Sequence, residues 1–445
     1  MDAFRIDRIP MCSGSIRPGD SGSSFRISKR QRNGDATSLV GPSEPPHQQH
    51  SRTIAVMRKS SRKMQHSHEH GKRICIVTWQ GGGNFGTNLQ AYALQHFIES
   101  LGYPVHILSS IPDFGNLIDV VYHSVNHLSI YRIWLQMRHV FDKSFQLVPD
   151  NPGIRRWTRR NLHISKVLSP HQLRKLVFET DCFISGSDQL WNTFFRVDPT
   201  MYLEFAKGKK CISYATSLGT RGVNPDYVNT LRTWLQKYRH ISVREQSSVR
   251  VLESITGRTD IAHVLDPTFL LSSKEWLSFC VSSIPRFNES TSFILCYLLG
   301  NSNNYENQVE EVRSKTGIAR IVLVPSAENP SFSIKGSTVL KNLSPPEFVH
   351  LLATATVVCT DSFHASALCI NLSKPFVEFM RFENDNPDSQ NCRILDVLDH
   401  FRLIGRIFNK DSNSWFQELD FSQSQDILKR DRLFSERYLR NAIED

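Results

Sequence analysis

The chain has 445 residues, 40% of them hydrophobic and 22% charged, which is long enough for two or three domains and typical of a globular enzyme. The formal net charge of +10 is concentrated at the start, because residues 1–73 carry a net charge of +8 and the remaining residues only +2. This distribution argues against a nucleic-acid enzyme, in which the positive charge would lie on the folded body.

Cysteines and apolar runs indicate the compartment. The nine cysteines never form a CxxC pair, and most lie inside apolar runs, as Cys75 does in the stretch ICIV. They are typical of buried thiols in a reducing compartment, so neither a metal site nor a disulfide framework is expected. No apolar run reaches the roughly 18 residues that span a bilayer, and the first residues lack a signal peptide's apolar stretch. We therefore expect a cytoplasmic protein without a cofactor.

Residues 1–72 are rich in Ser, Arg, Gly, Pro, Gln and His and have neither helical nor strand periodicity, which predicts a disordered basic tail. The run HSHEH at 66–70 is more typical of a solvated tail than of a metal site, because no second cluster of ligands accompanies it. Met57 and Met64 offer later start sites, and we expect the tail to be dispensable for folding.

From Arg73 onwards, apolar strands alternate with helices. Residues 74–79 predict a buried strand, 81–86 a glycine loop, 89–101 a helix with one apolar face, and 105–108 a second strand. The later strands of this first series are expected at 182–184, 211–215 and 240–243. A second series follows Gly257, with strands at 261–265, 292–299, 319–324, 357–359 and 375–378. Continuous apolar strands of this kind predict parallel sheets that are covered on both faces.

The predicted fold class is α/β, with two doubly wound Rossmann-like domains at 73–256 and 257–445 that face a cleft, the second ending in helices. An insertion at about 114–170 combines aromatic residues with arginines. It either covers the edge of a sheet as an amphipathic helical subdomain, which we favour, or lies against a membrane or an anionic acceptor.

Candidate site residues follow the strands, because ligands of open parallel sheets bind beyond the carboxyl ends of the strands. Four segments qualify, and they lie at 81–90, 185–192, 242–245 and 360–364. The first of them opens a helix whose free N–H groups favour an anion, although a tight structural turn explains the glycines equally well.

Single residues in these segments each allow two roles. Asp188 could orient a sugar hydroxyl or accept its proton, or it could cap a helix. Trp191 could offer an apolar face to a sugar ring or belong to the core. Arg244 could hold a carboxylate or phosphate, or form a structural ion pair. His364 opens a helix in which Asp361 is a candidate cap, and alone it would be a structural residue.

Taken together, these stretches resemble the polysaccharide pyruvyl transferase family. The matching pieces occur in the expected order between residues 74 and 393, and they are GGNFG with NLQ (82–90), GSDQLW (186–191), SYA (213–215), SVRE (242–245), DPT (266–268) and TDSFHA (360–365). The resemblance implies two Rossmann-like halves arranged as in glycosyltransferases of the B type, with phosphoenolpyruvate in the cleft. It also implies transfer of the enolpyruvyl carbon to two hydroxyls of one sugar, which gives a cyclic pyruvate ketal and releases phosphate.

The resemblance also gives the candidate residues expected roles. His364, whose charge changes near neutral pH, would protonate the methylene carbon of the donor, and Asp188 would serve the sugar hydroxyl. The expected donor-binding residues are Arg244, Gly82, Gly83, Asn84, Gly86, Asp361, Ser362, Arg381 and Arg393. The acceptor would be a glycan or a lipid-linked oligosaccharide, and the cytoplasmic protein could contact the inner face of the membrane peripherally. The expected contacts of the acceptor are Asn88, Gln90 and Trp191.

Ser362 departs from the family pattern, in which other branches carry arginine, a hydrophobic residue and then histidine. This chain has SFH at 362–364, so one donor-binding arginine is absent. Ser362 with the free N–H groups of the helix start, or Arg381 or Arg393, would replace it. Two alternatives stay open, a nucleotide-sugar glycosyltransferase and a non-catalytic protein that holds a glycan in the cleft.

Overall fold

The structure is a computed structural model, and it describes residues 71–108, 151–195, 197–281, 291–300, 302–327, 329–382 and 389–445. The expected basic tail, with its HSHEH run, lies outside these residues. So does the part of the expected insertion before residue 151.

The first sheet is parallel and has the strand order β2-β1-β3-β4. Its strands are β1 (Ile74–Val77), β2 (Val105–Leu108), β3 (Cys182–Ser185) and β4 (Lys210–Ser213). Ile74 and Ile76 of β1 belong to one hydrophobic cluster, whereas Cys75 and Val77 belong to another. Both faces of β1 are therefore buried, which explains why its sequence is apolar throughout and shows no alternation.

Two short strands, β5 (Ser242–Val243) and β6 (Ala262–His263), form a parallel pair beside this sheet. Isolated bridges connect Ile212 to His240 and Thr216 to Val243, so β5 continues the order beyond β4. The strand that was expected at 261–265 as the first of the second series is thus β6, and it pairs with β5. An apolar run of this length does not specify its partner strand, and the assignment of this strand to the second series was therefore wrong.

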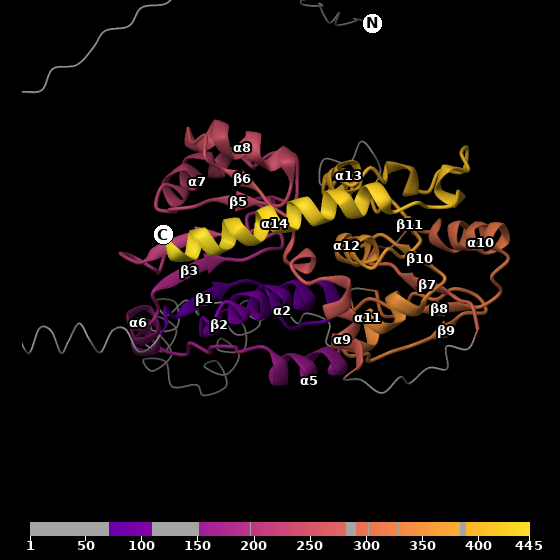
Figure 1. Cartoon of the computed structure of the whole chain (residues 1–445), viewed down its shortest axis with the longest axis horizontal. Helices are drawn as coiled ribbons and strands as arrows, with labels where there is room; N and C mark the ends of the chain where they lie inside the picture. Colours follow the sequence, from indigo (N-terminus) through magenta and orange to yellow (C-terminus); the bar gives the residue numbers. More distant parts are fainter. Residues whose placement is uncertain are drawn as a thin grey trace, which may run out of the picture. The chain divides into compact units, whose positions relative to one another are not determined.

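The second sheet is also parallel and has the order β11-β10-β7-β8-β9. Its strands are β7 (Ile294–Tyr297), β8 (Ile321–Leu323), β9 (Thr338–Val339), β10 (Val357–Thr360) and β11 (Phe376–Glu378). Both residues of β9 are exposed, which is why no apolar pattern predicted this edge strand. The predicted α/β class with parallel sheets covered by helices is confirmed (Figure 1).

The connecting helices vary in length between 8 and 23 residues. They are α2 (Phe85–Ser100), α5 (Pro152–Asn161), α6 (Pro170–Glu179), α7 (Val228–Leu235), α8 (Gln246–Thr256), α9 (Ser273–Val281), α10 (Tyr305–Thr316), α11 (Pro345–Thr354), α12 (Phe363–Asn371), α13 (Asn391–His400) and α14 (Ser422–Glu444). In the part of the chain that the structure describes, none of them is long and apolar enough to cross a bilayer.

Helix α2 connects the two sheets. The ring of Phe85, its first residue, stacks on Phe348 of α11 with 4.3 Å between centroids and meets Tyr297 of β7 edge-on at 5.8 Å. One hydrophobic cluster accordingly contains residues of both sheets, among them Ile74 and Leu295. The domain limits at 256 and 257 stay a prediction.

Helix α14 extends past both sheets (Figure 1). Near its start, Gln425 Nε2 donates to the carbonyl oxygen of Ile370 in α12 at 2.7 Å. Further along, Tyr438 OH donates to the carbonyl oxygen of Ser213 at the end of β4 at 3.3 Å. The last helix therefore stabilises elements from both halves of the chain.

Helix α5 belongs to the expected insertion and is amphipathic. Trp157 is buried and meets the ring of Tyr92 edge-on with 5.4 Å between centroids, whereas Arg156, Arg159 and Arg160 are exposed. In the described part of the insertion, α5 therefore packs its apolar side on the core, whereas the expected subdomain over the sheet edge stays a prediction. Its other aromatic residues, Tyr131, Trp134 and Phe141, lie outside the described residues.

Candidate active site

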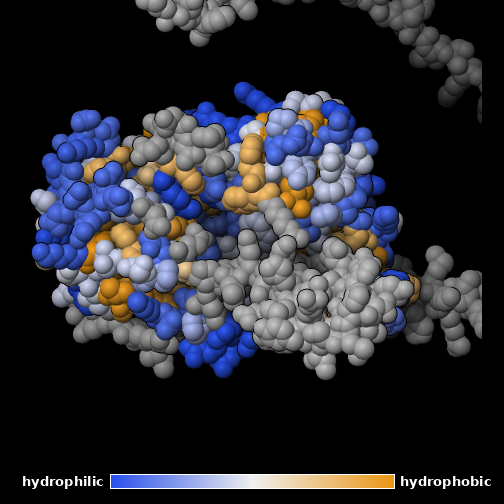
Figure 2. Space-filling model, turned by 180° about the vertical axis from the view of Figure 1, so that it is seen from behind, coloured by the Kyte–Doolittle hydropathy of each residue, from blue (hydrophilic) through white to orange (hydrophobic). Residues whose placement is uncertain are grey.

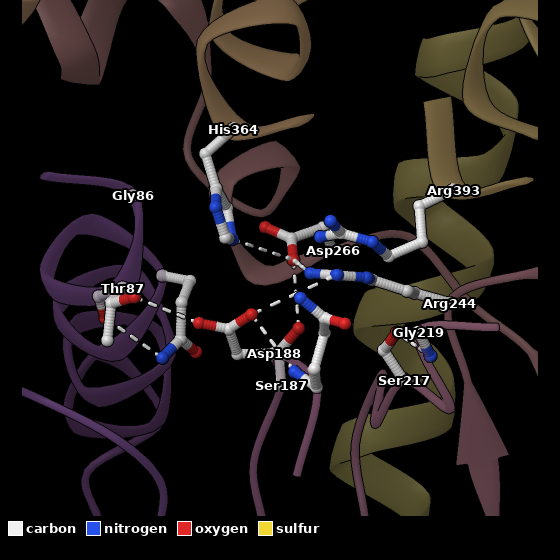
Figure 3. Close-up of polar contacts among 12 residues, drawn as sticks. Gly86, Thr87, Ser187, Asp188, Ser217, Gly219, Arg244, Asp266, His364 and Arg393 are labelled. Atoms are coloured by element: carbon white, nitrogen blue, oxygen red, sulfur yellow. Dashed lines mark hydrogen bonds and ion pairs between the residues drawn. The ribbon is translucent and has the colours of Figure 1, made fainter. Parts of the chain in front are cut away.

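Four strand-end segments that the sequence marked meet at one place, together with a fifth that follows β6 (Figure 3). The first sheet contributes the residues after β1 and β3, the two strands between which its order reverses, and the second sheet contributes those after β10. Such reversal points are where open α/β sheets form ligand crevices. The converging side chains are Thr87, Ser187, Asp188, Arg244, Asp266 and His364.

Arg244 is fully buried and held by acidic partners. Its Nε donates to Glu245 Oε1 at 2.7 Å and its Nη1 to Asp266 Oδ2 at 3.1 Å. The guanidinium also lies over the Phe363 ring, with 4.0 Å from Cζ to the centroid, which is a cation–π contact. Burial alone would lower the pKa of Arg244, but the neighbouring carboxylates raise it above its usual value, so this residue stays a cation.

One nitrogen of Arg244 remains available. Its Nη2 lies 4.0 Å from Asp188 Oδ1, too far for a hydrogen bond, and it has no hydrogen-bond partner among the described residues. A buried N–H group without a partner costs free energy, on the order of 1–3 kcal/mol. This nitrogen is therefore suited to an anionic ligand.

His364 is the second residue of α12 and is almost completely buried. A Cβ atom built on Gly86 would lie 2.3 Å from its Nδ1, so this edge of the ring packs directly on the start of α2. The other nitrogen, Nε2, lies 3.7 Å from Asp266 Oδ2 and has no hydrogen-bond partner among the residues described. Nε2 is therefore a buried nitrogen that a ligand could pair with.

The charge of His364 depends on several neighbours. Burial lowers its pKa, Asp266 and Asp188 raise it, and Arg244 and Arg393 lower it again. The net result is a pKa below the usual value for histidine, which favours the neutral imidazole at pH 7. A bound dianion would favour the protonated form.

Asp188 faces His364 from the first sheet. Its backbone has a φ of 76°, in the left-handed region where residues other than glycine are uncommon. Its Oδ2 accepts from Thr87 Oγ1 at 2.9 Å and its Oδ1 from the N–H of Gln189 at 2.9 Å. Burial would raise the pKa of Asp188, but His364, Arg244 and Arg393 outweigh this effect and lower it, so the carboxylate stays ionised.

Arg393 of α13 completes the cationic side of the site. Its Nη2 donates to Gln390 Oε1 at 2.9 Å, while its Nε is buried without a hydrogen-bond partner in the described part of the chain. Burial and the nearby charges of Arg244 and Arg381 lower the pKa of Arg393 to about 10. Of the two arginines that could replace the one absent at Ser362, Arg393 therefore offers a free buried nitrogen.

Arg381 and Asp361 bind each other at the edge of the second sheet. Arg381 Nε lies 3.3 Å from Asp361 Oδ2, and the same carboxylate accepts from Tyr305 OH and from the N–H groups of Leu299 and Gly300. Asp361 thus joins the ends of β7 and β10. A carboxylate in this position would repel an anionic donor rather than bind it.

The glycine loop differs from the expected anion cradle. Asn84 caps α2, because its Oδ1 accepts from the N–H groups of Gly86 at 2.9 Å and Thr87 at 3.3 Å. Asn88 Oδ1 in turn accepts from the N–H of Gly81 at 2.8 Å. Protein side chains therefore already occupy these three donors. Gly82 adopts a positive φ of 64°, which glycine allows without strain, and Gly83 is buried in the loop.

Helix α12 offers the better anion site. The side chain of its N-cap Ser362 makes no capping hydrogen bond, in contrast to Asn84 at the start of α2. Its first N–H groups and the positive end of its dipole face the site without a side-chain cap.

The three expected acceptor contacts all lie in the interior. Trp191 is fully buried, stacks on Tyr202 with 5.8 Å between centroids and has no exposed ring surface for a sugar. Gln90 Nε2 donates to the carbonyl oxygen of Thr87 at 2.9 Å, and Asn88 fastens the glycine loop. The N–H groups of these three side chains donate to oxygen atoms of the protein itself, so these residues support the structure around the site.

Asp266 has no role assigned from the sequence, although it is central to the site. The DPT motif follows an expected strand, and this position would have marked its carboxylate as a candidate. Thr87 and Ser187 carried no such signal, because their partners Asp188 and Asp266 are far away in the chain.

The comparisons with known proteins address the family. The model of the polysaccharide pyruvyl transferase family matches residues 84–380. Among curated proteins no match is found. Similar solved structures include the UDP-GlcNAc 2-epimerase from Neisseria meningitidis (11% identity, 83% of this chain and 94% of that chain, TM-score 0.40) and the MurG protein from Acinetobacter baumannii (10% identity, 84% and 99%, TM-score 0.37). The family match covers more than half of the chain and the strand-end motifs from Asn84 to His364, so this protein belongs to the polysaccharide pyruvyl transferase family.

Proposed function

We propose that the protein transfers pyruvate from phosphoenolpyruvate to two hydroxyls of one sugar in a glycan, forming a ketal and releasing phosphate. The observation that carries this proposal is the set of buried nitrogens without partners, Arg244 Nη2, His364 Nε2 and Arg393 Nε. They surround one place, opposite the ionised Asp188 (Figure 3). A donor with both a phosphate and a carboxylate would supply the missing acceptors.

The donor would be held by two cationic side chains and one helix. Arg244 and Arg393 each have a free guanidinium nitrogen for an acid group of phosphoenolpyruvate. The start of α12 at Ser362 has no side-chain cap and attracts a second anionic group through its N–H groups. Together these features would replace the arginine that is absent at position 362.

His364 and Asp188, on opposite sides of the donor, would transfer the protons of the reaction. His364 Nε2 gives its proton to the methylene carbon of phosphoenolpyruvate, which becomes a methyl group and leaves the neighbouring carbon electron-poor. A sugar hydroxyl adds to that carbon as its proton passes to Asp188. The second hydroxyl then displaces phosphate, and the two hydroxyl protons restore His364 and protonate the departing phosphate.

Phosphate release from phosphoenolpyruvate in the presence of lipid-linked oligosaccharides tests this function. We expect phosphate to appear only when acceptor is present, with one ketal formed per phosphate. Release of a nucleoside diphosphate from a nucleotide sugar would identify a glycosyltransferase instead. Binding of the oligosaccharide without turnover of either donor would identify a glycan-binding protein.

We also propose that the protein works in the cytoplasm at the inner face of the membrane, where a lipid-linked acceptor would be found. Support comes from α5 and the residues that follow it, since residues 151–178 contain seven Lys and Arg and no Asp or Glu. Strongly hydrophilic surface lies at the lower edge of Figure 2, where Figure 1 places α5. Anionic lipid headgroups attract such a surface.

Sedimentation with phospholipid vesicles checks the membrane contact. The protein should bind vesicles that contain phosphatidylglycerol and should bind less as salt screens the attraction. Changing three exposed arginines of α5 to glutamine, Arg156, Arg159 and Arg160, should remove most of this binding. The matched control changes three exposed lysines elsewhere, Lys315, Lys410 and Lys429. Equal loss in both variants would show a general charge effect and contradict a specific surface.

A further inference from the structure

Asp266 is the carboxylate on which the site converges. Its side chain is fully buried, and its Oδ2 accepts from Ser187 Oγ at 2.8 Å and from Arg244 Nη1 at 3.1 Å. The same oxygen lies 3.7 Å from His364 Nε2. One oxygen atom therefore faces residues that follow β3, β5 and β10.

The other oxygen of Asp266 fixes the direction of the first. Its Oδ1 accepts from the N–H of Thr268 at 3.0 Å and from Thr268 Oγ1 at 2.8 Å. Asp266 is in this way the N-cap of the short helical turn Pro267–Phe269. The carboxylate cannot rotate without breaking this cap, so Oδ2 points towards Arg244 and His364 before any ligand binds.

We infer that Asp266 is a positioning residue that holds Arg244 in place and stabilises the protonated imidazole of His364 for the transfer proposed above. The inference rests on that proposed function. It assigns Asp266 no proton transfer of its own. The proton passes from His364 Nε2 to the methylene carbon of the donor, and Asp266 stays ionised throughout.

The charges around His364 explain why it needs this partner. Two guanidinium groups, Arg244 and Arg393, oppose protonation, as do the positive ends of α2 at Gly86 and of α12 itself. Two carboxylates, Asp266 and Asp188, favour it, and Asp266 has the larger effect of the two. Burial would raise the pKa of Asp266, but His364, Arg244 and the Thr268 hydrogen bonds lower it, so its negative charge is present at neutral pH.

Asp266→Asn removes the charge and keeps the shape. Without this charge the pKa of His364 should fall, and each unit of that fall reduces the protonated fraction about tenfold above the pKa. We expect turnover at pH 7.5 to drop about tenfold, and the loss to shrink as the pH is lowered, because acid restores the protonated imidazole. The KM for phosphoenolpyruvate should change less, because Arg244 keeps Glu245. A purely structural role would give the same loss at every pH.

An NMR titration of His364 tests the coupling without any turnover. The pKa of His364 should fall in Asp266→Asn. It should stay unchanged in the control Asp396→Asn, which removes the carboxylate of Asp396 in α13, an acceptor of a hydrogen bond from Ser247. If the wild-type protein releases no phosphate, the proposed function fails, but this titration still decides on Asp266. An unchanged pKa in Asp266→Asn would overturn the inference.

Ser187→Ala gives a second measurement with the opposite sign, in case Asp266→Asn does not fold. This variant keeps the charge of Asp266 but removes the hydrogen bond from Ser187, which stabilises the carboxylate and weakens its attraction for other groups. Asp266 should then attract the imidazolium more strongly, and the pKa of His364 should rise. A fall or no change in the pKa would contradict the proposed role of Asp266.

Discussion

Replacing His364 with alanine should lower the turnover number on the order of a hundredfold or more, while binding of phosphoenolpyruvate changes little. The reason lies in the orientation of the ring, because Nδ1 packs on Gly86 and Nε2 is the nitrogen without a partner in the site. No other described histidine lies in the set of residues that converge there. Steady-state kinetics with phosphoenolpyruvate as the varied substrate separate the two parameters. Normal turnover in this variant would make His364 a structural residue at a helix start.

A substitution of Gly86, which packs against the Nδ1 edge of the His364 ring, tests the orientation of that ring. In Gly86→Ala the new Cβ would lie 2.3 Å from Nδ1, so the imidazole must move, although alanine itself favours a helix. Turnover should therefore fall at least tenfold. The thermal transition should fall as well, because the new Cβ would also lie 2.6 Å from the Cβ of His364, a contact that rotation of the ring cannot relieve. Gly222→Ala is the matched control, because a Cβ there meets no atom within 4 Å. Full activity of Gly86→Ala would show that the ring position does not matter.

Arg244→Lys should chiefly weaken the binding of phosphoenolpyruvate, by about 1–3 kcal/mol, and so raise its KM. Arginine reaches Glu245 and Asp266 and still leaves Nη2 for the donor, which a single ammonium group cannot do. Turnover at saturating donor should fall much less than in His364→Ala. Arg250→Lys makes the same change on the exposed side of α8 and should leave the kinetics unaltered. An unchanged KM for phosphoenolpyruvate in Arg244→Lys would place the donor elsewhere.

The strands and the position of the site could be predicted because both follow from local patterns. Strands such as β1 are buried on both faces, so their sequences are apolar throughout, and the residues that follow them lie at one edge of a sheet. Together with the expectation that the two halves face a cleft, this rule predicts that Asp188, Arg244 and His364 lie close together. The pairing of β6 with β5 was not predictable, because a short apolar run does not determine which strand it pairs with.

The hydrogen-bond partners of the polar residues could not be predicted from the sequence. Asn84 and Asn88 look like ligands of a glycine loop, yet their side chains satisfy the N–H groups of that same loop. Trp191 follows the site segment directly but turns into the core. Asp266 acquires its importance only through contacts with Ser187 and His364, 79 and 98 positions away in the chain.

The position of α14 has a consequence for how the chain folds during synthesis. Lys72 and Lys210 donate to the carbonyl oxygen of Ile443, and Arg239 and His240 bind the Asp445 carboxylate. Residues 443–445 are translated after every other described residue, so these partners have left the ribosome long before they can be paired. The first sheet should therefore reach its final packing only after α14 has been released from the exit tunnel. Leu439 and Ile443 of α14 belong to the same hydrophobic cluster as Ile74 of β1, so until then a nascent chain would expose part of this cluster to chaperones.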